Sequence, residues 1–163
     1  MAPSDRVATV PDRMAAQWRS AMFPLLNLFL SMHRTLSEHE RMGPSVMLIY
    51  VTVCVGNIQK LMRERSIPPD YTATAILPRE LVVPMSRSAI AAATGLPRET
   101  VRRHIGHLVE QGMLIEDPRG GVTIVPGVIQ ERGYEPLLEK LLTEFARTSE
   151  ALLRVGVIEV NSS

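Results

Sequence analysis

The sequence contains a single cysteine, Cys54, among its 163 residues. A lone thiol cannot form an intramolecular disulfide, and no second cysteine is present to share a zinc ion with it. Cys54 lies in the apolar segment 46–55, where we expect a buried structural thiol rather than a nucleophile. A chain of this kind folds by packing alone, and a reducing cytoplasm is its expected compartment.

Aromatic residues are also scarce, at 4% of the sequence, and nine methionines help to fill the space that aromatic rings would otherwise occupy. The hydrophobic fraction of 45% and the charged fraction of 21% are close to those of globular domains. These values exclude a disordered or fibrous chain. The length suffices for one domain, or for a small domain with a helical extension.

No uninterrupted apolar run is long enough to cross a membrane. The longest run, residues 46–56, is well short of the ~20 residues that a spanning helix needs. The first apolar cluster, residues 23–30, begins too late for a secretory signal and follows Asp5 and Asp12. We therefore expect a soluble cytoplasmic protein with no membrane partner.

The sequence also has no excess of positive or negative charge. It contains 18 basic and 17 acidic residues, and its formal net charge is +1. Sixteen of the basic residues are arginines and two are lysines. A surface that is strongly basic throughout is therefore excluded. Any binding of nucleic acid must depend on where the arginines lie.

Long helices are predicted on both sides of the central region. After a flexible arm at residues 1–11, apolar residues recur every three or four positions from 12 to 41, and Pro24 should kink or divide this helix. A second series runs from about 134 to 154. The apolar positions of the two series are Met14, Trp18, Met22, Leu25, Phe29, Met32 and Leu36, and then Tyr134, Leu138, Leu141, Phe145, Thr148 and Leu152. We expect these stripes to pair two copies of the chain.

Between the two series, residues 45–65 are predicted to form a buried helix, because their first half is apolar nearly all round. Residues 67–80 are expected to be an irregular connection that leads to a short strand at 81–83. The more informative segment follows, from 86 to 105.

Residues 86–105 have the spacing of a helix, a tight turn and a second helix. Gly95 lies where the turn requires a positive φ, and Val101, six residues later, should point back into the shared core. Ser86 is a good N-cap for the first helix, and Pro97 suits the first position of the second helix.

A hairpin is predicted directly after the second helix, which Gly112 should end. Residues 113–125 form two short β-branched segments around the turn Asp117-Pro118-Arg119-Gly120-Gly121. A helix-turn-helix pattern alone is common by chance, but the same pattern followed by such a hairpin is much more specific. The order predicts a winged helix-turn-helix domain.

The sequence at 97–103, Pro-Arg-Glu-Thr-Val-Arg-Arg, resembles the start of the recognition helix of the Crp/Fnr regulators, whose pattern is Ser-Arg-Glu-Thr-Val-x-Arg. The resemblance covers residues 84–126. It implies that Arg98, Glu99 and Arg103 reach the edges of DNA bases. The residues that it implies at the phosphate backbone are Ser86, Ser88 and Thr100.

Two features depart from that family. His104 occupies a position that is usually apolar, and residues 12–65 are predicted as helices, where the family has a nucleotide-binding β-barrel. The order of two helices, a winged helix and a closing helix is instead similar to that of MarR-type regulators. This second resemblance implies dimerisation through the terminal helices.

The chemistry of these side chains agrees with DNA reading. An arginine can bond guanine O6 and N7 together, and a carboxylate can accept from cytosine N4, so Arg98, Glu99 and Arg103 suit G·C pairs. Other arginines should meet phosphates, which position the protein without reading sequence. These are Arg87, Arg102 and, at the tip of the wing, Arg119, for which the minor groove is a second possibility.

Glu99 and the two histidines of this segment allow other interpretations, but none of them predicts a catalytic or metal site. Glu99 could instead favour the positive end of the helix dipole. Residues 104–107 spell a phosphate-binding signature of class I aminoacyl-tRNA synthetases, which belongs to a much longer nucleotide-binding fold. His104 and His107 have no third ligand nearby in sequence. We expect no metal, no cofactor and no enzymatic activity.

The sequence thus predicts a mainly α protein with a small β-wing, organised as a winged helix-turn-helix flanked by dimerisation helices. The expected regions are a flexible arm at 1–11, a helical dimerisation and possible sensor region at 12–66, the winged helix-turn-helix at 67–126, and a dimerisation helix with tail at 127–163.

The expected function is sequence-specific regulation of transcription by a homodimer on palindromic double-stranded DNA. The recognition helix, about 97–111, would lie in the major groove, and the wing, 113–125, on the backbone or minor groove. Two alternatives remain: a winged-helix module that binds proteins, and a regulator that responds to a small-molecule effector.

Overall fold

The computed structural model describes residues 6–64, 67–72 and 75–161. The chain divides into two compact units, one formed by residues 40–134 and the other by residues 1–39 together with 135–163. Helices predominate in both units, and a two-stranded hairpin follows the second helix of the helix-turn-helix. The prediction of a mainly α protein with a small β-wing is therefore confirmed.

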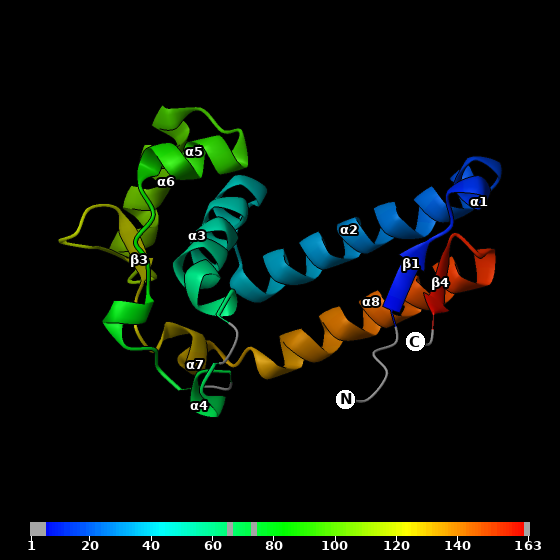
Figure 1. The fold of residues 1–163 in the computed structure, drawn as a ribbon. Coiled ribbons are helices and arrows are strands. Elements are labelled where there is room, and N and C mark those ends of the chain that lie inside the picture. The colour runs from blue at the N-terminus through cyan, green and yellow to red at the C-terminus, as the bar shows by residue number, and fades with distance from the viewer. Residues whose placement is uncertain (1–5, 65–66, 73–74, 162–163) are drawn as a thin grey trace. The chain divides into compact units, whose positions relative to one another are not determined.

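The unit of residues 40–134 is built around a long central helix, α3 (Figure 1). The elements in chain order are α3 (Pro44–Met62), α4 (Pro69–Thr72), the 3₁₀ turn η1 (Arg79–Leu81), α5 (Arg87–Thr94), α6 (Arg98–Glu110), β2 (Leu114–Glu116), β3 (Val122–Ile124) and α7 (Val128–Arg132). Helix α3 contacts α5, α6 and β3, so that one core joins α3 to the helix-turn-helix and the wing.

Helix α3 is the one helix in the described part of the chain that is long and apolar enough to span a membrane. However, Ile49, Tyr50 and Val53 are almost completely buried, against Ile90, Val101 and other residues of the helix-turn-helix. These residues of α3 therefore belong to a protein core.

The boundary predicted between the dimerisation region, 12–66, and the winged helix-turn-helix, 67–126, differs from the structure. Helix α3 lies before that boundary but packs with the winged helix-turn-helix.

The helix-turn-helix forms at the residues that the sequence indicated. The Ser86 hydroxyl accepts a hydrogen bond from the backbone N–H of Ala89 at 3.1 Å, and Gly95 ends α5 with a φ of +70°. Ile105 and Leu108 are fully buried beside Val101. Pro97 differs slightly from its prediction, since it is the N-cap of α6 and not its first helical residue.

The wing is an antiparallel hairpin in which Leu114 lies opposite Ile124. Met85 adds a third short segment by exchanging backbone hydrogen bonds with Val122, at 3.0 and 2.9 Å. Gly121 is required at this junction, because its φ is +88° and a Cβ there would lie 2.4 Å from the Met85 carbonyl oxygen. The expected strand at 81–83 is absent, since Arg79–Leu81 forms a 3₁₀ turn.

The buried side chain of Asn57, which the sequence analysis did not single out, ties α3 to the wing. Its Oδ1 accepts from the backbone N–H of Ile124 at 2.9 Å, and its Nδ2 donates to the Val83 carbonyl at 2.7 Å. The Asn57 backbone carbonyl accepts in turn from the N–H of Val83 at 2.9 Å. With only 2% of the residue exposed, these bonds cannot be replaced by water without opening the structure.

We expect Asn57→Leu to lower the free energy of unfolding by about 1–3 kcal/mol, because it leaves the partly buried Ile124 N–H and Val83 carbonyl without these partners. Urea unfolding of the full chain measures the change. Gln59→Leu, at an exposed position of the same helix, is the matched control and should leave the stability nearly unchanged. Equal stability of the two variants would contradict the role given to Asn57.

A buried polar cluster gathers around Glu40, whose side chain is 1% exposed. The Arg132 guanidinium lies 2.7 Å from its Oε2, and the Tyr134 hydroxyl donates to its Oε1. The Tyr50 hydroxyl is 3.4 Å from that of Tyr134. Tyr134 was predicted as the first apolar position of the last helix, but it precedes that helix and its hydroxyl is used in this cluster.

Burial, assisted by the negative charge of Glu40, raises the pKa of the Cys54 thiol to about 12. The reactive thiolate is therefore scarce near neutral pH, and we expect Cys54 to react with a disulfide reagent at pH 8 on the order of 10³-fold more slowly than in the unfolded chain. Reaction with a chromogenic aromatic disulfide, with and without urea, measures the ratio. Rapid reaction of the folded protein would contradict the prediction.

The second unit joins the two ends of the described chain. Its elements are β1 (Arg6–Thr9), α1 (Pro11–Ala16), α2 (Trp18–Glu40, of which the last residue belongs to the first unit), α8 (Glu135–Val155) and β4 (Ile158–Asn161). Strands β1 and β4 pair in antiparallel fashion, with Val7 opposite Val160 (Figure 1). The expected flexible arm at 1–11 is thus wrong for residues 6–11, because backbone pairing fixes β1 and Pro11 begins α1; residues 1–5 lie outside the described part.

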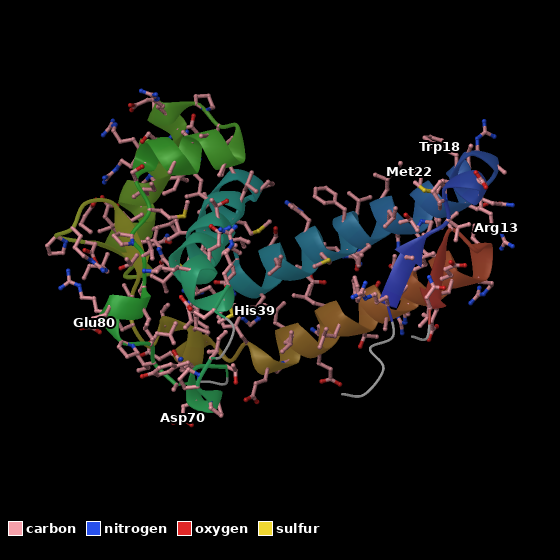
Figure 2. All side chains as sticks on the ribbon, viewed as in Figure 1. Arg13, Trp18, Met22, His39, Asp70 and Glu80 are labelled. Atoms are coloured by element: carbon pink, nitrogen blue, oxygen red, sulfur yellow. The ribbon has the colours of Figure 1, made fainter. Side chains whose placement is uncertain are left out.

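Helix α2 continues through Pro24, and the break falls earlier, at Gln17 between α1 and α2. Many of its apolar side chains remain exposed in the single chain, and Trp18 projects outward from α2 (Figure 2). The exposed large apolar residues of this unit are Val7, Met14, Trp18, Phe23, Leu25, Leu26, Phe29, Leu30, Leu138, Leu142, Phe145, Leu153 and Val160.

Candidate nucleic-acid interface

Helix α6 has one buried and one exposed face over its whole length. Val101, Ile105 and Leu108 are fully buried, whereas Arg102, Arg103 and His107 are exposed. Arg98 and Arg103 belong to the exposed set. The turn at Gly95 produces this arrangement, because it reverses the chain so that the apolar stripe of α6 meets α5 and α3.

Arg98 and Arg103 differ from the other predicted DNA-contacting arginines in having no ion pair with an acidic side chain in the described part of the chain. Both lie within the first two turns of α6, where the backbone N–H groups of the helix start add a positive field. Their guanidinium groups are therefore available to a ligand without breaking an existing contact.

Glu99 and Arg102 pair with each other across one turn of α6. Arg102 Nη2 lies 2.6 Å and Nε 2.9 Å from the two carboxylate oxygens. The hydrogen bonds from Arg102 lower the pKa of Glu99, and the carboxylate raises the pKa of Arg102. Both side chains are exposed, so the pair adds little stability. A contact of either residue with DNA would have to replace or share it.

The start of α5 presents the three residues predicted to meet phosphates there. Ser86 and Ser88 are exposed, and their hydroxyl oxygens are 3.0 Å apart. The Arg87 guanidinium pairs with Glu116 on the wing strand β2. Thr100, the remaining hydroxyl of the prediction, is half-buried in the first turn of α6.

Arg119 is held within the wing. Its Nε and Nη2 donate to the two oxygens of Asp117 at 2.9 and 3.0 Å, and Nη2 also donates to the Val82 carbonyl at 3.0 Å. The Asp117 side chain is 4% exposed and also accepts from Arg79 at 3.2 Å. Hydrogen bonds from the side chain and backbone of Arg119 hold the pKa of Asp117 far below its usual value.

The structure therefore gives Arg119 a structural task that the sequence analysis missed. The signal was the Asp-Pro-Arg-Gly order, in which an aspartate caps the turn by accepting from the N–H two residues later, here at 2.8 Å. The Arg119 side chain is still 42% exposed at the wing tip. It can face a phosphate while remaining bonded to Asp117.

The two histidines of α6 differ in their surroundings. His104 is half-buried, and burial together with the charge of Arg103 lowers its pKa, which favours the neutral form. His107 lies 3.4 Å from Glu110 on the exposed face. Residues 6–64, 67–72 and 75–161 contain no group of three or more His, Cys, Asp or Glu placed to hold a metal ion.

Comparison with protein families gives a match to the Crp-like helix-turn-helix domain over residues 60–125. No curated protein and no solved structure matches the chain. The match confirms the resemblance seen at 84–126 and extends it upstream to the end of α3; the likeness to MarR-type regulators stays a prediction. Residues 60–125 therefore match a Crp-like helix-turn-helix domain, and the hairpin of β2 and β3 adds the wing of a winged helix-turn-helix, the kind of domain with which transcription regulators bind DNA.

Proposed function

We propose that this chain is a cytoplasmic, sequence-specific regulator of transcription that binds palindromic double-stranded DNA as a homodimer. Helix α6 lies in the major groove, where Arg98 and Arg103 read guanines and Glu99 contributes to the reading of a neighbouring cytosine. The wing contacts the backbone or the minor groove.

The proposal depends on which arginines of the helix-turn-helix are paired with acidic side chains and which are not. Arg98 and Arg103, proposed to read bases, have no acidic partner among the described residues, while Arg87 and Arg102, proposed to touch phosphates, are paired with glutamates. A bidentate contact with guanine O6 and N7 uses two N–H groups of the guanidinium at once, and an arginine without an acidic partner can make it without giving up an ion pair.

Backbone contacts follow from the same surface. The exposed Ser86 and Ser88 hydroxyls at the start of α5 can donate to phosphate oxygens, as can the Thr100 hydroxyl. The arginines proposed at the backbone are Arg87, Arg102 and Arg119. These contacts set the position of α6 in the groove and carry no sequence information.

Exposed apolar surface supports the homodimer. Phe23, Phe29 and Phe145 are 73, 65 and 57% exposed in the single chain, on helices α2 and α8 of one unit. A large exposed apolar patch marks an interaction surface, and a second copy is the partner that the two-fold symmetry of a palindromic site calls for. Each copy would then place one α6 on one half-site.

Selection of bound fragments from random double-stranded DNA tests the proposal. We expect the selected sites to be palindromes with G·C pairs in each half-site, at a half-site spacing of about 34–36 Å. Binding should weaken steeply with salt, because phosphate contacts release counterions. Binding that is absent or independent of salt would instead favour a winged-helix module that binds proteins.

A further inference from the structure

A cavity of about 370 Å³ lies behind the wing, within the unit of residues 40–134. Helices α3, α4 and α7, the segment 75–82 and the chain that follows β3 form its walls. Its lining includes the side chains of Val55, Ile58, Ile76 and Ile129. The volume falls in the range of small-molecule sites, and it is too small to hold a helix from a partner protein.

The residues that line the cavity indicate the charge and polarity of the ligand that it can bind. None of the described residues that line the cavity carries a formal charge, and the polar side chains among them are uncharged, such as Tyr71 and Gln130. An ionised ligand would lose its hydration there without gaining a counter-charge. The walls therefore suit a neutral and largely apolar molecule.

Two residues of the cavity wall also carry hydrogen bonds of the wing. The Ile124 backbone N–H donates to Asn57, which itself lines the cavity, and the Val82 carbonyl accepts from Arg119 at the wing tip, at 3.0 Å. A ligand that displaces Val82 or Ile124 must change these bonds. A movement of the cavity wall at Val82 or Ile124 would therefore also move the wing.

We propose that this cavity binds a neutral, largely apolar small molecule, and that its occupancy changes the affinity for DNA through Val82 and Ile124. The change in DNA affinity, unlike the binding of the ligand, rests on the proposed function. The sequence predicted a possible sensor only in general terms, within residues 12–66. The cavity instead lies inside the winged-helix unit and defines the chemistry of the ligand.

Fluorescence titration of the full chain with N-phenylnaphthylamine, a neutral apolar dye, tests the site directly. Ile129→Trp should fill the cavity and remove one saturable site per chain. Leu48→Trp is the matched control, because Leu48 is also 42% exposed but does not line the cavity. We expect the wild type and Leu48→Trp to keep the site, and the sulfonated form of the dye to bind it at least tenfold more weakly. Equal dye binding by the two variants would overturn the site.

DNA affinity measured with and without saturating dye tests the connection to the wing. We expect a change of about fivefold or more in the wild type and none in Ile129→Trp. An unchanged affinity in the wild type would overturn the connection. If the wild type fails to bind DNA without dye, the proposed function fails, while the fluorescence titration still decides whether the cavity binds the ligand.

Discussion

Replacing both Arg98 and Arg103 by lysine is expected to remove most of the preference for the selected DNA site while leaving binding to unrelated DNA nearly unchanged. Lysine keeps the charge that attracts phosphates but lacks the planar fork that bonds guanine O6 and N7 together. Each lost bidentate contact should cost ~1–3 kcal/mol of discrimination, so the double variant should lose about 30-fold or more. Titration of selected and scrambled DNA by fluorescence anisotropy measures both affinities.

Arg87→Ala is the matched control at the start of α5, because the ion-pair partner of Arg87 is Glu116 and not a residue proposed to read bases. It removes a charge proposed to meet a phosphate, so it should weaken binding to both DNAs alike and reduce the salt slope by about one. If Arg87→Ala reduced the preference and the two lysine substitutions did not, the assignment of base contacts would be wrong. Arg98 and Arg103 are exposed, so their replacement by lysine should not disturb the fold.

Phe29→Asp is expected to convert the protein from a dimer to a monomer and to lower DNA affinity by about 10² or more, because two linked half-site contacts become one. The side chain is 65% exposed in the single chain, so the substitution should have little effect on the fold of the monomer. In the dimer it would bury a carboxylate in an apolar contact, which is costly. Sedimentation velocity and DNA titration measure the two effects.

Gln59→Asp provides the same charge outside this apolar surface. Gln59 is exposed and lies on α3, in the unit of residues 40–134. It should leave both the dimer and the DNA affinity close to wild type. A dimer that persists in Phe29→Asp would show that this face of α2 is not the interface.

The helix-turn-helix was predictable because its signals are local. A cap at Ser86, a positive φ at Gly95 and the spacing from Gly95 to Val101 each follow from the geometry of a few neighbouring residues. The same holds for the hairpin around Gly120 and Gly121, since both adopt the positive φ that the turn composition indicated. For that reason the fold of residues 86–125 could be predicted without a structure.

Contacts between distant parts of the chain were not predictable in this way. Nothing near Arg6 in the sequence indicates that its strand pairs with Ile158–Asn161, and nothing near Asn57 indicates that it bonds Ile124. The ion pair of Arg87 with Glu116 joins residues 29 positions apart. Such partners depend on which surfaces the folded chain brings together, and the periodicity of a single segment does not contain this information.

The sequence by itself determined the helix-turn-helix and its wing, and it identified the arginines that face outward, because helix period, caps and turns are properties of short stretches of chain. Only the tertiary structure decided which of those arginines already have acidic partners, that α3 belongs to the core of the winged helix, and that a cavity lies behind the wing. Pairing and enclosure require residues that are far apart along the chain to meet in space.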